Sequence, residues 1–178
     1  MVALHTRRRA LPEPLLRLPH HLTGVQVQIR PVAPSDAAAV NELLGQLGYL
    51  QDDVAGTTAR IRFWADDPAS AAYVADADGN LLGVVAVHVC PYFERAGFWG
   101  RMVALVVAAE TRGQGIGGQL VAAAERFAAE RGCDRMEVSS SDHRRAAHAF
   151  YLAHGYVDQA GSSSRFRRDL SALGAAGR

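Results

Sequence analysis

Four glycines within seven residues constrain this chain more than any other segment. Residues 112–118 read RGQGIGG, and they join an apolar stretch ending at Val107 to a helical pattern that runs to Arg131. Glycines let backbone N–H groups converge on one point, because no side chain blocks a close approach and positive φ angles are allowed. The helix that starts there adds unpaired amides and a partial positive charge. We therefore interpret the segment as a pyrophosphate-binding turn, with a turn rich in glycine for packing alone as the alternative.

Hydrophobic periodicity on both sides of this turn predicts one mixed α/β domain. The expected strands cover residues 25–29, 71–75, 81–90, 101–107 and 135–140, followed by one or two closing strands within 156–170. The expected helices follow a Ser35 cap, cover residues 54–65, run from the glycine turn to Arg131, and cover residues 143–153. The segment Asp78-Gly79-Asn80 suits a tight hairpin turn, and residues 91–100 are expected to form a loop.

The basic residues and histidines exclude several kinds of chemistry. All 19 basic residues are arginine, so a Walker A phosphate loop and Schiff-base chemistry, which both need lysine, cannot operate here. The formal charge of +1 falls well short of the basic excess of a nucleic-acid-binding domain. His143, His148 and His154 have no acid or cysteine partners at metal-ligand spacing, so no metal site is predicted. Arginine-only usage with abundant alanine is typical of GC-rich bacterial coding.

Cysteine content and hydropathy favour a cytoplasmic protein. Cys90 and Cys133 are too few for a disulfide framework and form no CxxC pair. No apolar run approaches the ~18 residues of a membrane span, and the N-terminus lacks the apolar segment of a secretory signal. We expect a flexible basic arm over residues 1–23, the domain over 24–172 and a tail over 173–178. A transit peptide or a nucleic-acid-binding arm is the alternative for the first segment.

Two phosphate-binding folds could explain the glycine turn. The spacing Gly113-x-Gly115-x-x-Gly118 fits the dinucleotide fingerprint, and Glu137 lies roughly 20 residues on, where a ribose-binding acid is sought. However, five residues separate the apolar strand from the first glycine, and Glu137 falls in the middle of an expected strand. Only about 60 residues then remain to complete the sheet. The dinucleotide fold is therefore the weaker alternative.

Two motifs resemble those of the GNAT superfamily of N-acetyltransferases. The pattern R/Q-x-x-G-x-G/A is met by Arg112, Gly115 and Gly117, and the pattern A-x-x-F-Y-x-x-x-G-F/Y is met by residues 147–156. This resemblance implies an α/β (α+β) domain with a mixed, mostly antiparallel sheet of six to seven strands, about four helices and a splayed central strand pair. It also implies acetyl-CoA as co-substrate. The cofactor-binding positions that it implies are Leu105, Val106, Val107, Arg112, Gly113, Gln114, Gly115, Ile116, Gly117, Gly118 and Tyr151.

The resemblance further implies that a primary amine attacks the thioester carbonyl directly. Tyr151 matches the family position of the general acid that protonates the departing thiolate, and a core aromatic is the alternative. Many members carry a glutamate on the strand before the glycine turn, but residues 102–105 read MVAL here. His88 is the candidate general base in its place, with Glu94 and a water chain as alternatives. Arg144 stands where the family often has an asparagine.

Acidic residues in the first half of the chain predict a cationic acceptor, although solvated loop acids explain them equally well. These residues are Asp52, Asp53, Asp66 and Asp67. The predicted function is acetyl transfer from acetyl-CoA to a small-molecule amine, with no nucleic-acid or membrane partner. A CoA-binding module without turnover and a protein or peptide N-acetyltransferase are the alternatives. Homodimers occur in the family, but the sequence gives no independent sign of one.

Overall fold

A five-stranded sheet organises the part of the chain that the structure describes. The computed structural model describes residues 26–48 and 53–170. Its strands are β1 (Gln28–Pro31), β2 (Ser70–Ala77), β3 (Asn80–Pro91), β4 (Phe98–Val107) and β5 (Cys133–Val138). Its α-helices are α1 (Ala37–Gly45), α2 (Val54–Asp66), α3 (Ile116–Glu130) and α4 (Arg145–Ala153), and two short 3-10 helices are η1 (Pro34–Asp36) and η2 (Ala109–Thr111).

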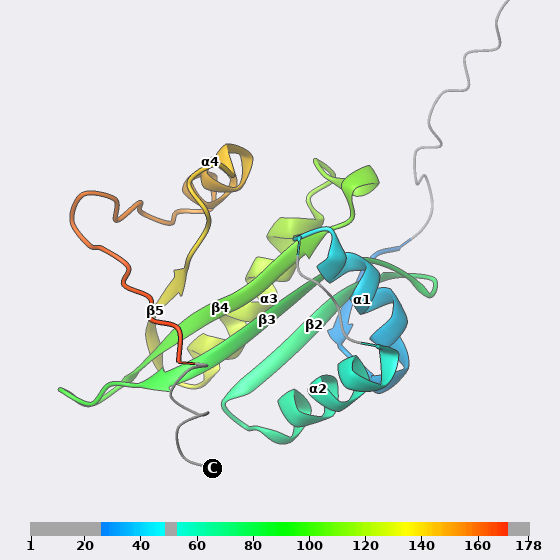
Figure 1. The fold of residues 1–178 in the computed structure, drawn as a ribbon, viewed down its shortest axis with the longest axis horizontal. Helices are drawn as coiled ribbons and strands as arrows, with labels where there is room; N and C mark the ends of the chain where they lie inside the picture. The colour runs from blue at the N-terminus through cyan, green and yellow to red at the C-terminus, as the bar shows by residue number, and fades with distance from the viewer. Residues whose placement is uncertain (1–25, 49–52, 171–178) are drawn as a thin grey trace, which may run out of the picture.

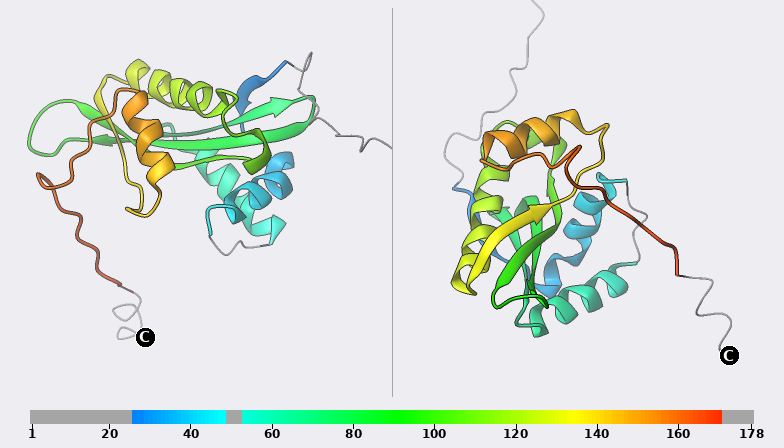
Figure 2. Two further views of the ribbon diagram at one scale, coloured as in Figure 1. Left: turned by 90° about the horizontal axis from the view of Figure 1, so that it is seen from above. Right: turned by 90° about the vertical axis from the view of Figure 1, so that its left-hand side faces the viewer.

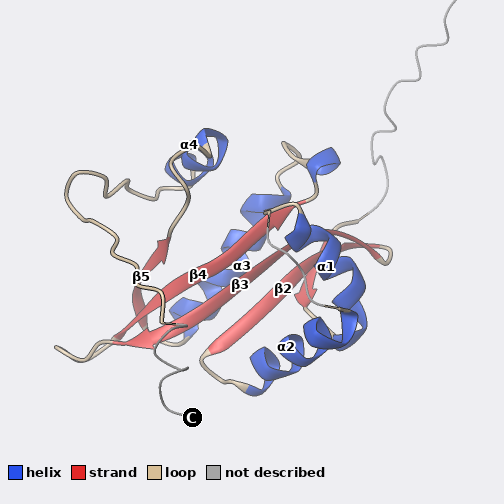
Figure 3. Cartoon of the chain, viewed as in Figure 1, coloured by secondary structure: helices blue, strands red, loops and turns tan. Residues whose placement is uncertain are grey.

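The strands lie side by side in the order of the chain, from β1 to β5 (Figure 1). The first three pairings are antiparallel, and only the pairing of β4 with β5 is parallel. Figure 3 shows α3 connecting these two parallel strands. A dinucleotide-binding fold has a mostly parallel sheet, so that alternative is wrong. The predicted mixed, mostly antiparallel sheet with about four helices is confirmed.

Helices cover both faces of the sheet, with α3 on one face and α1 and α2 on the other (Figure 2). We name these the α3 face and the α1/α2 face. Side chains of neighbouring strand residues point to opposite faces, so β3 supplies both cores. Buried residues on the α3 face include Val85, Val87, Leu120 and Phe127. Buried residues on the α1/α2 face include Val40, Ile61, Val84 and Val106.

The two hairpins of the sheet differ in how well the sequence predicted them. Asp78 and Gly79 adopt φ angles of 52° and 87°, which confirms the tight turn between β2 and β3. The loop expected over residues 91–100 is shorter, because β3 continues to Pro91 and β4 already begins at Phe98. Phe98 pairs with Pro91 on one side and Cys133 on the other, so ladder hydrogen bonds override the aromatic and glycine-rich composition of this segment.

Aspartates begin the helices of the α1/α2 face. We expected Ser35 to cap the first helix, but this residue lies inside η1, and the Asp36 carboxylate accepts the Ala33 amide at 2.7 Å instead. Asp53 caps α2 by accepting the Gly56 amide at 2.7 Å. The Asp53 carboxylate satisfies an amide that the start of α2 leaves unpaired, whereas Asp36 is the N-cap of α1 but bonds back to the residue before η1. Among the described helices, none combines the length and apolar character that crossing a bilayer requires.

The closing strands expected within residues 156–170 are absent, so the described sheet has five strands and not six to seven. This segment leaves α4 as an extended coil with largely exposed side chains. Its backbone bonds locally, with the Ser162 and Ser163 amides both donating to Gln159, and Gly161 has a φ of 81°. A serine- and glycine-rich stretch buries too little apolar surface to hold an edge strand. The predicted arm at 1–23 and tail at 173–178 lie outside the described residues.

Candidate active site

The parallel strands β4 and β5 separate halfway along β4. Their ladder ends where Met102 pairs with Val138, whereas β4 continues to Val107 with β3 as its partner. A β-bulge at this point adds Val103 to β4, because Val87 pairs with Met102 and Ala86 pairs with Ala104. The register thus shows the expected splayed strand pair, although β5 lies at the edge of the described sheet. The edge of β4 beyond Met102 offers free backbone groups to an extended ligand.

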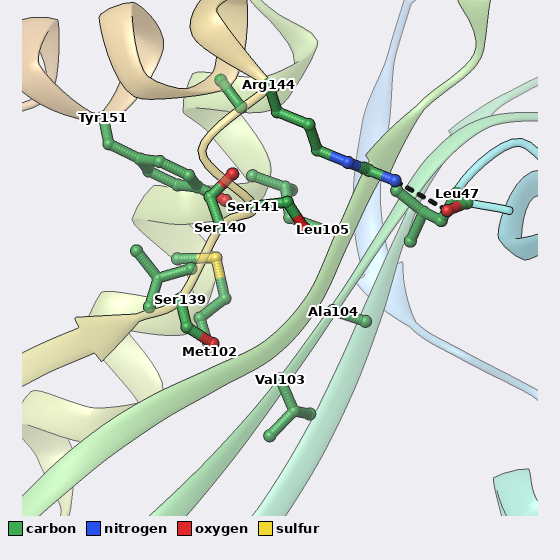
Figure 4. Close-up of a pocket in the computed structure, with 12 residues that line it drawn as sticks. Leu47, Met102, Val103, Ala104, Leu105, Ser139, Ser140, Ser141, Arg144 and Tyr151 are labelled. Carbon is green, nitrogen blue, oxygen red and sulfur yellow. Dashed lines mark hydrogen bonds between the residues drawn. The ribbon is translucent and has the colours of Figure 1, made fainter. Parts of the chain in front are cut away.

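A pocket of about 130 Å³ fills the space between the two strands (Figure 4). One wall is the segment 102–105 of β4, and the opposite wall is the run of serines 139–141 that follows β5. Tyr151 points into the pocket from α4. Leu47, Val138, Arg144 and Ala147 complete the lining. Backbone, hydroxyl and guanidinium groups therefore surround the space where the strands part.

The glycine turn has the geometry of an anion cradle. Gly113 and Gly115 adopt φ angles of 80° and 79°, which side-chain-bearing residues rarely adopt, and Gly115 is the N-cap of α3. A Cβ on Gly117 would lie 3.1 Å from the Phe150 ring, and a Cβ on Gly118 would lie 2.8 Å from His154 Nε2. Gly117 and Gly118 therefore leave room for the Phe150 and His154 side chains, whereas nothing lies within 4 Å of a Cβ built on Gly113 or Gly115, beside the unpaired first amides of α3. These residues fit a pyrophosphate group.

Arg112 is anchored to the strand before the turn. Its Nε donates to the Val107 carbonyl at 3.1 Å, so the side chain closes the end of β4 against the glycine turn. Thr111 is buried beside it and donates its hydroxyl to the Ala108 carbonyl. The predicted phosphate contact of Arg112 would use its terminal nitrogens, and it stays a prediction.

Tyr151 is half-buried among aromatic rings. Its ring lies 5.4 Å from that of Phe150 and 5.6 Å from that of Tyr156, measured between centroids. Burial raises the pKa of the Tyr151 phenol, and the positive charge of Arg144 opposes that rise. The phenol therefore stays protonated at neutral pH, as a proton donor must. The Tyr156 phenol donates to Glu125 Oε1 at 2.9 Å, so this tyrosine has a structural partner.

His88 lies on the α1/α2 face of β3 and does not line the pocket. Its Nδ1 is 2.8 Å from Ser70 Oγ, and Ser70 in turn donates to Asp67 Oδ2 at 2.7 Å. Because the Ser70 proton goes to Asp67, the serine oxygen accepts from Nδ1–H, which leaves the lone pair on Nε2. The side chain is 39% exposed. His88 thus has the tautomer of a base, but it is not among the residues that line the pocket.

The acids expected to attract a cationic acceptor do not meet at the pocket. Asp53 caps α2, and Asp67 accepts from the Ala69 amide and from Ser70, which hold the pKa of its carboxyl below the usual range. Asp66 is exposed at the end of α2, and Asp52 lies outside the described residues. None of the pocket-lining residues that the structure describes is an acid.

Arg144 lines the pocket, a position that sequence reasoning did not predict. Its Nη2 donates to the Leu47 carbonyl at 2.6 Å, so the side chain spans the pocket from the start of α4 to the end of α1 (Figure 4). The serines 139–141 were also missed. The available signal was the three-serine run at the end of the expected strand 135–140, because polar residues at a strand end often line a site.

Comparison with known proteins identifies the family. The sequence matches the acetyltransferase (GNAT) family over residues 37–156, more than half of the chain. The chain belongs to this family. Its domain is that of an acyl-CoA-dependent N-acetyltransferase, and the family uses acetyl-CoA. The predicted resemblance and enzyme class are thereby confirmed.

Two relatives and one solved structure illustrate the likeness. The aminoalkylphosphonate N-acetyltransferase of Salmonella typhimurium is 38% identical over 93 residues, which cover 52% of this chain and 58% of that enzyme. An uncharacterised N-acetyltransferase of Bacillus subtilis is 27% identical over 140 residues, covering 76% of this chain and 93% of that protein. An aminoglycoside N-acetyltransferase bound to a bisubstrate analogue superposes with a TM-score of 0.69 at 20% identity, covering 81% and 99% of the two chains. The last likeness shows the fold.

Proposed function

We propose that this protein transfers an acetyl group from acetyl-CoA to the primary amine of a small molecule. One observation carries the proposal: the open edge of β4 at 103–105 lines the pocket, and the anion cradle at residues 113–118 follows the end of that same strand. The cradle fits the pyrophosphate, and the open strand edge fits an extended pantetheine arm. Both halves of the cofactor thus have matching groups, one along β4 and one in the turn that follows it.

The cofactor would be held mainly by backbone. The amides at residues 113–118 would bind the pyrophosphate, with the terminal nitrogens of Arg112 beside them. The free edge of Leu105 to Val107 would pair with the pantetheine arm, and one amide there would polarise the thioester carbonyl. Such an oxyanion contact is worth about 3 kcal/mol in measured cases. Acetyl-CoA supplies the activated acyl group, and the chain supplies position and polarity.

The chemical step needs two proton movements. The neutral amine nitrogen forms a bond to the carbonyl carbon, the carbon–sulfur bond breaks, and the sulfur leaves with its electron pair. Tyr151 gives its phenolic proton to that sulfur, and the nitrogen loses a proton to solvent. His88 would accept this proton through water at Nε2, because Ser70 and Asp67 hold its other nitrogen protonated. The phenol then regains its proton from solvent.

The acceptor is proposed to be a small amine. Relatives named for aminoalkylphosphonates and aminoglycosides both act on small molecules, which supports this choice over a protein or peptide. The pocket is also small, at about 130 Å³. The test is acetyl-CoA with a panel of short amines, followed by release of free CoA thiol. Release that depends on the amine is expected.

A CoA-binding module without turnover is the second candidate. The observation that favours it is the lack of any acid or histidine among the described residues that line the pocket. Calorimetry with CoA separates the two. CoA binding with no thiol release for any amine would favour the module, and absence of CoA binding would overturn both proposals.

A further inference from the structure

Two arginines from distant parts of the chain meet at one serine beside the pocket. Arg101 Nη2, from β4, donates to Ser139 Oγ at 3.3 Å, and Arg165 Nη1, from the segment after α4, donates to the same oxygen at 3.1 Å. Ser139 itself lines the pocket. We propose that these arginines form a subsite for an acid group on the acceptor amine, such as a phosphonate or a carboxylate. The proposal rests on the acetyl transfer proposed above.

The partners of both arginines carry no charge. Neither Arg101 nor Arg165 has a carboxylate partner among residues 26–48 and 53–170. Glu137 pairs with Arg101 in the backbone ladder, but its carboxylate is bound by Arg135 Nε at 2.9 Å. Two guanidinium groups that share one hydroxyl repel each other. An anion placed between them removes that repulsion and accepts the paired hydrogen bonds that arginine offers.

The rest of the pocket has the same sign of charge. Arg144 lines it, and its described partner is the neutral Leu47 carbonyl. No acid lines the pocket within the described residues, and Asp53 and Asp67 are engaged elsewhere by amide and hydroxyl groups. A field set by arginines attracts the anionic end of an amphoteric amine and repels a polyamine.

The acid group belongs to the acceptor and not to the cofactor. Arg101 lies six residues before the end of β4 at Val107, which places it about 20 Å along the strand from that end, after which the glycine turn follows. The pyrophosphate cradle is therefore at the other end of β4. Arg101 also shares the α1/α2 face with His88, its partner across the β3–β4 ladder. A ligand that reaches Arg101 from the pocket therefore extends away from the glycine turn.

Binding of three amines with the same carbon chain tests the proposal. Calorimetry on the CoA-saturated protein in phosphate-free buffer compares 3-aminopropylphosphonate, 3-aminopropan-1-ol and 1,3-diaminopropane, which end in an acid, a neutral and a cationic group. The phosphonate is expected to bind about tenfold or more tightly than the other two, from one charge-assisted contact or more. Arg101→Gln and Arg165→Gln are each expected to weaken phosphonate binding about tenfold and to leave CoA binding unchanged.

A neighbouring arginine serves as the control. Arg167 is exposed in the same segment as Arg165, so Arg167→Gln removes the same charge without touching Ser139, and phosphonate binding should not change. Because Arg165 is itself exposed, its variant leaves the core intact even if Arg101→Gln fails to fold. Equal or tighter binding of the diamine, or full phosphonate affinity in Arg165→Gln, would overturn the subsite.

Thiol release separates this proposal from the proposed function. Release with the diamine but not with the phosphonate would support acetyl transfer and overturn the acid subsite. Arginine-dependent binding of the phosphonate, with no thiol release for any amine, would support an anion-binding subsite and overturn acetyl transfer.

Discussion

At the scale of single residues, Tyr151 and Tyr156 form a natural pair for comparison. Their rings contact each other, but the Tyr156 phenol donates to Glu125, whereas the Tyr151 phenol faces the pocket. Burial raises the pKa of both phenols, so both stay protonated at neutral pH. Position, and not acidity, therefore distinguishes the proposed proton donor from its neighbour.

Tyr151→Phe is expected to lower kcat by about 10²- to 10⁴-fold, the usual contribution of a general acid. KM for acetyl-CoA should change little, because the ring remains. Steady-state kinetics by thiol release gives both values. Tyr156→Phe is the matched control: it should retain kcat and lose about 1 kcal/mol of unfolding free energy with its hydrogen bond. An unchanged kcat in Tyr151→Phe would refute the acid role.

Gly83 on β3 packs closely against β4 and α3, and a substitution there tests this packing. A Cβ there would lie 2.8 Å from the Val106 carbonyl oxygen and 2.9 Å from Leu120 Cδ1, so backbone and core must both shift. Gly83→Ala is expected to lower the unfolding free energy by about 1 to 3 kcal/mol in urea denaturation. Gly45→Ala is the control, because nothing lies within 4 Å of the new Cβ in α1. That variant should be stabilised by about 0.5 to 1 kcal/mol.

At the scale of elements, the periodic and strongly marked segments were predictable. The glycine turn, the amphipathic α3 and the Asp78–Gly79 hairpin follow from local sequence, because glycine placement and apolar spacing dictate them. The extended β3–β4 hairpin and the missing C-terminal strands were not predictable. Strand ends depend on partners: Phe98 has two neighbouring strands, and the segment after Tyr156 has neither a partner nor a buried face.

The candidate site shows the same contrast between features that local sequence predicts and features that depend on distant segments. The residues of the two motifs were named from local patterns, and the structure brings Tyr151 and Leu105 to one pocket. Contacts between distant segments could not be predicted. Arg144 reaches Leu47 across 97 positions of sequence, and Arg101 and Arg165 meet only because the chain returns past β5. Nothing in the local sequence around these arginines specifies such a partner.

The backbone of the glycine turn carries the next prediction. Gly115→Ala places a side-chain-bearing residue at a φ of 79°, which costs about 1 to 2 kcal/mol and distorts the amide cradle. KM for acetyl-CoA is expected to rise about tenfold, the equivalent of losing one hydrogen bond of about 1.5 kcal/mol to a phosphate oxygen. Gly132→Ala has the same conformation, with a φ of 75°, at the other end of α3. The control should lose stability but keep its KM, and an equal rise in KM for both variants would contradict the cradle.

At the scale of the whole molecule, a salt-bridge network joins the first strand to the rest of the sheet. Arg30 on β1 binds Asp36 through Nη1 at 2.7 Å and Asp76 on β2 through Nε at 2.8 Å. These contacts hold the pKa of both carboxyls below the usual range. Such groups stabilise the fold above the unfolded pKa of about 3.9, and that contribution is lost as pH falls through the lower folded pKa.

Arg30→Gln should therefore destabilise the protein at pH 7 and matter less in acid. After solvent screening, the Arg30–Asp36 pair is expected to contribute about 1 kcal/mol. The difference between wild type and variant in urea denaturation should shrink as pH falls below about 4. Arg135→Gln, which breaks an exposed pair with Glu137, is the control and should change stability little at either pH. A stability difference between wild type and Arg30→Gln that grows as the pH falls would contradict the stabilising role of the Arg30 salt bridges.

The bulge at Val103 and the parting of β4 from β5 occur at the same position. β4 therefore consists of two regular halves on either side of Val103. This extra residue determines to which face of the sheet the side chains of the second half point. Met102 faces the α3 side and Ala104 faces the opposite side because Val103 stands outside the alternation. Deleting this one residue would leave a regular alternation in which both halves of β4 face as they do now. The opening between β4 and β5 thus begins at the residue that interrupts the alternation of β4.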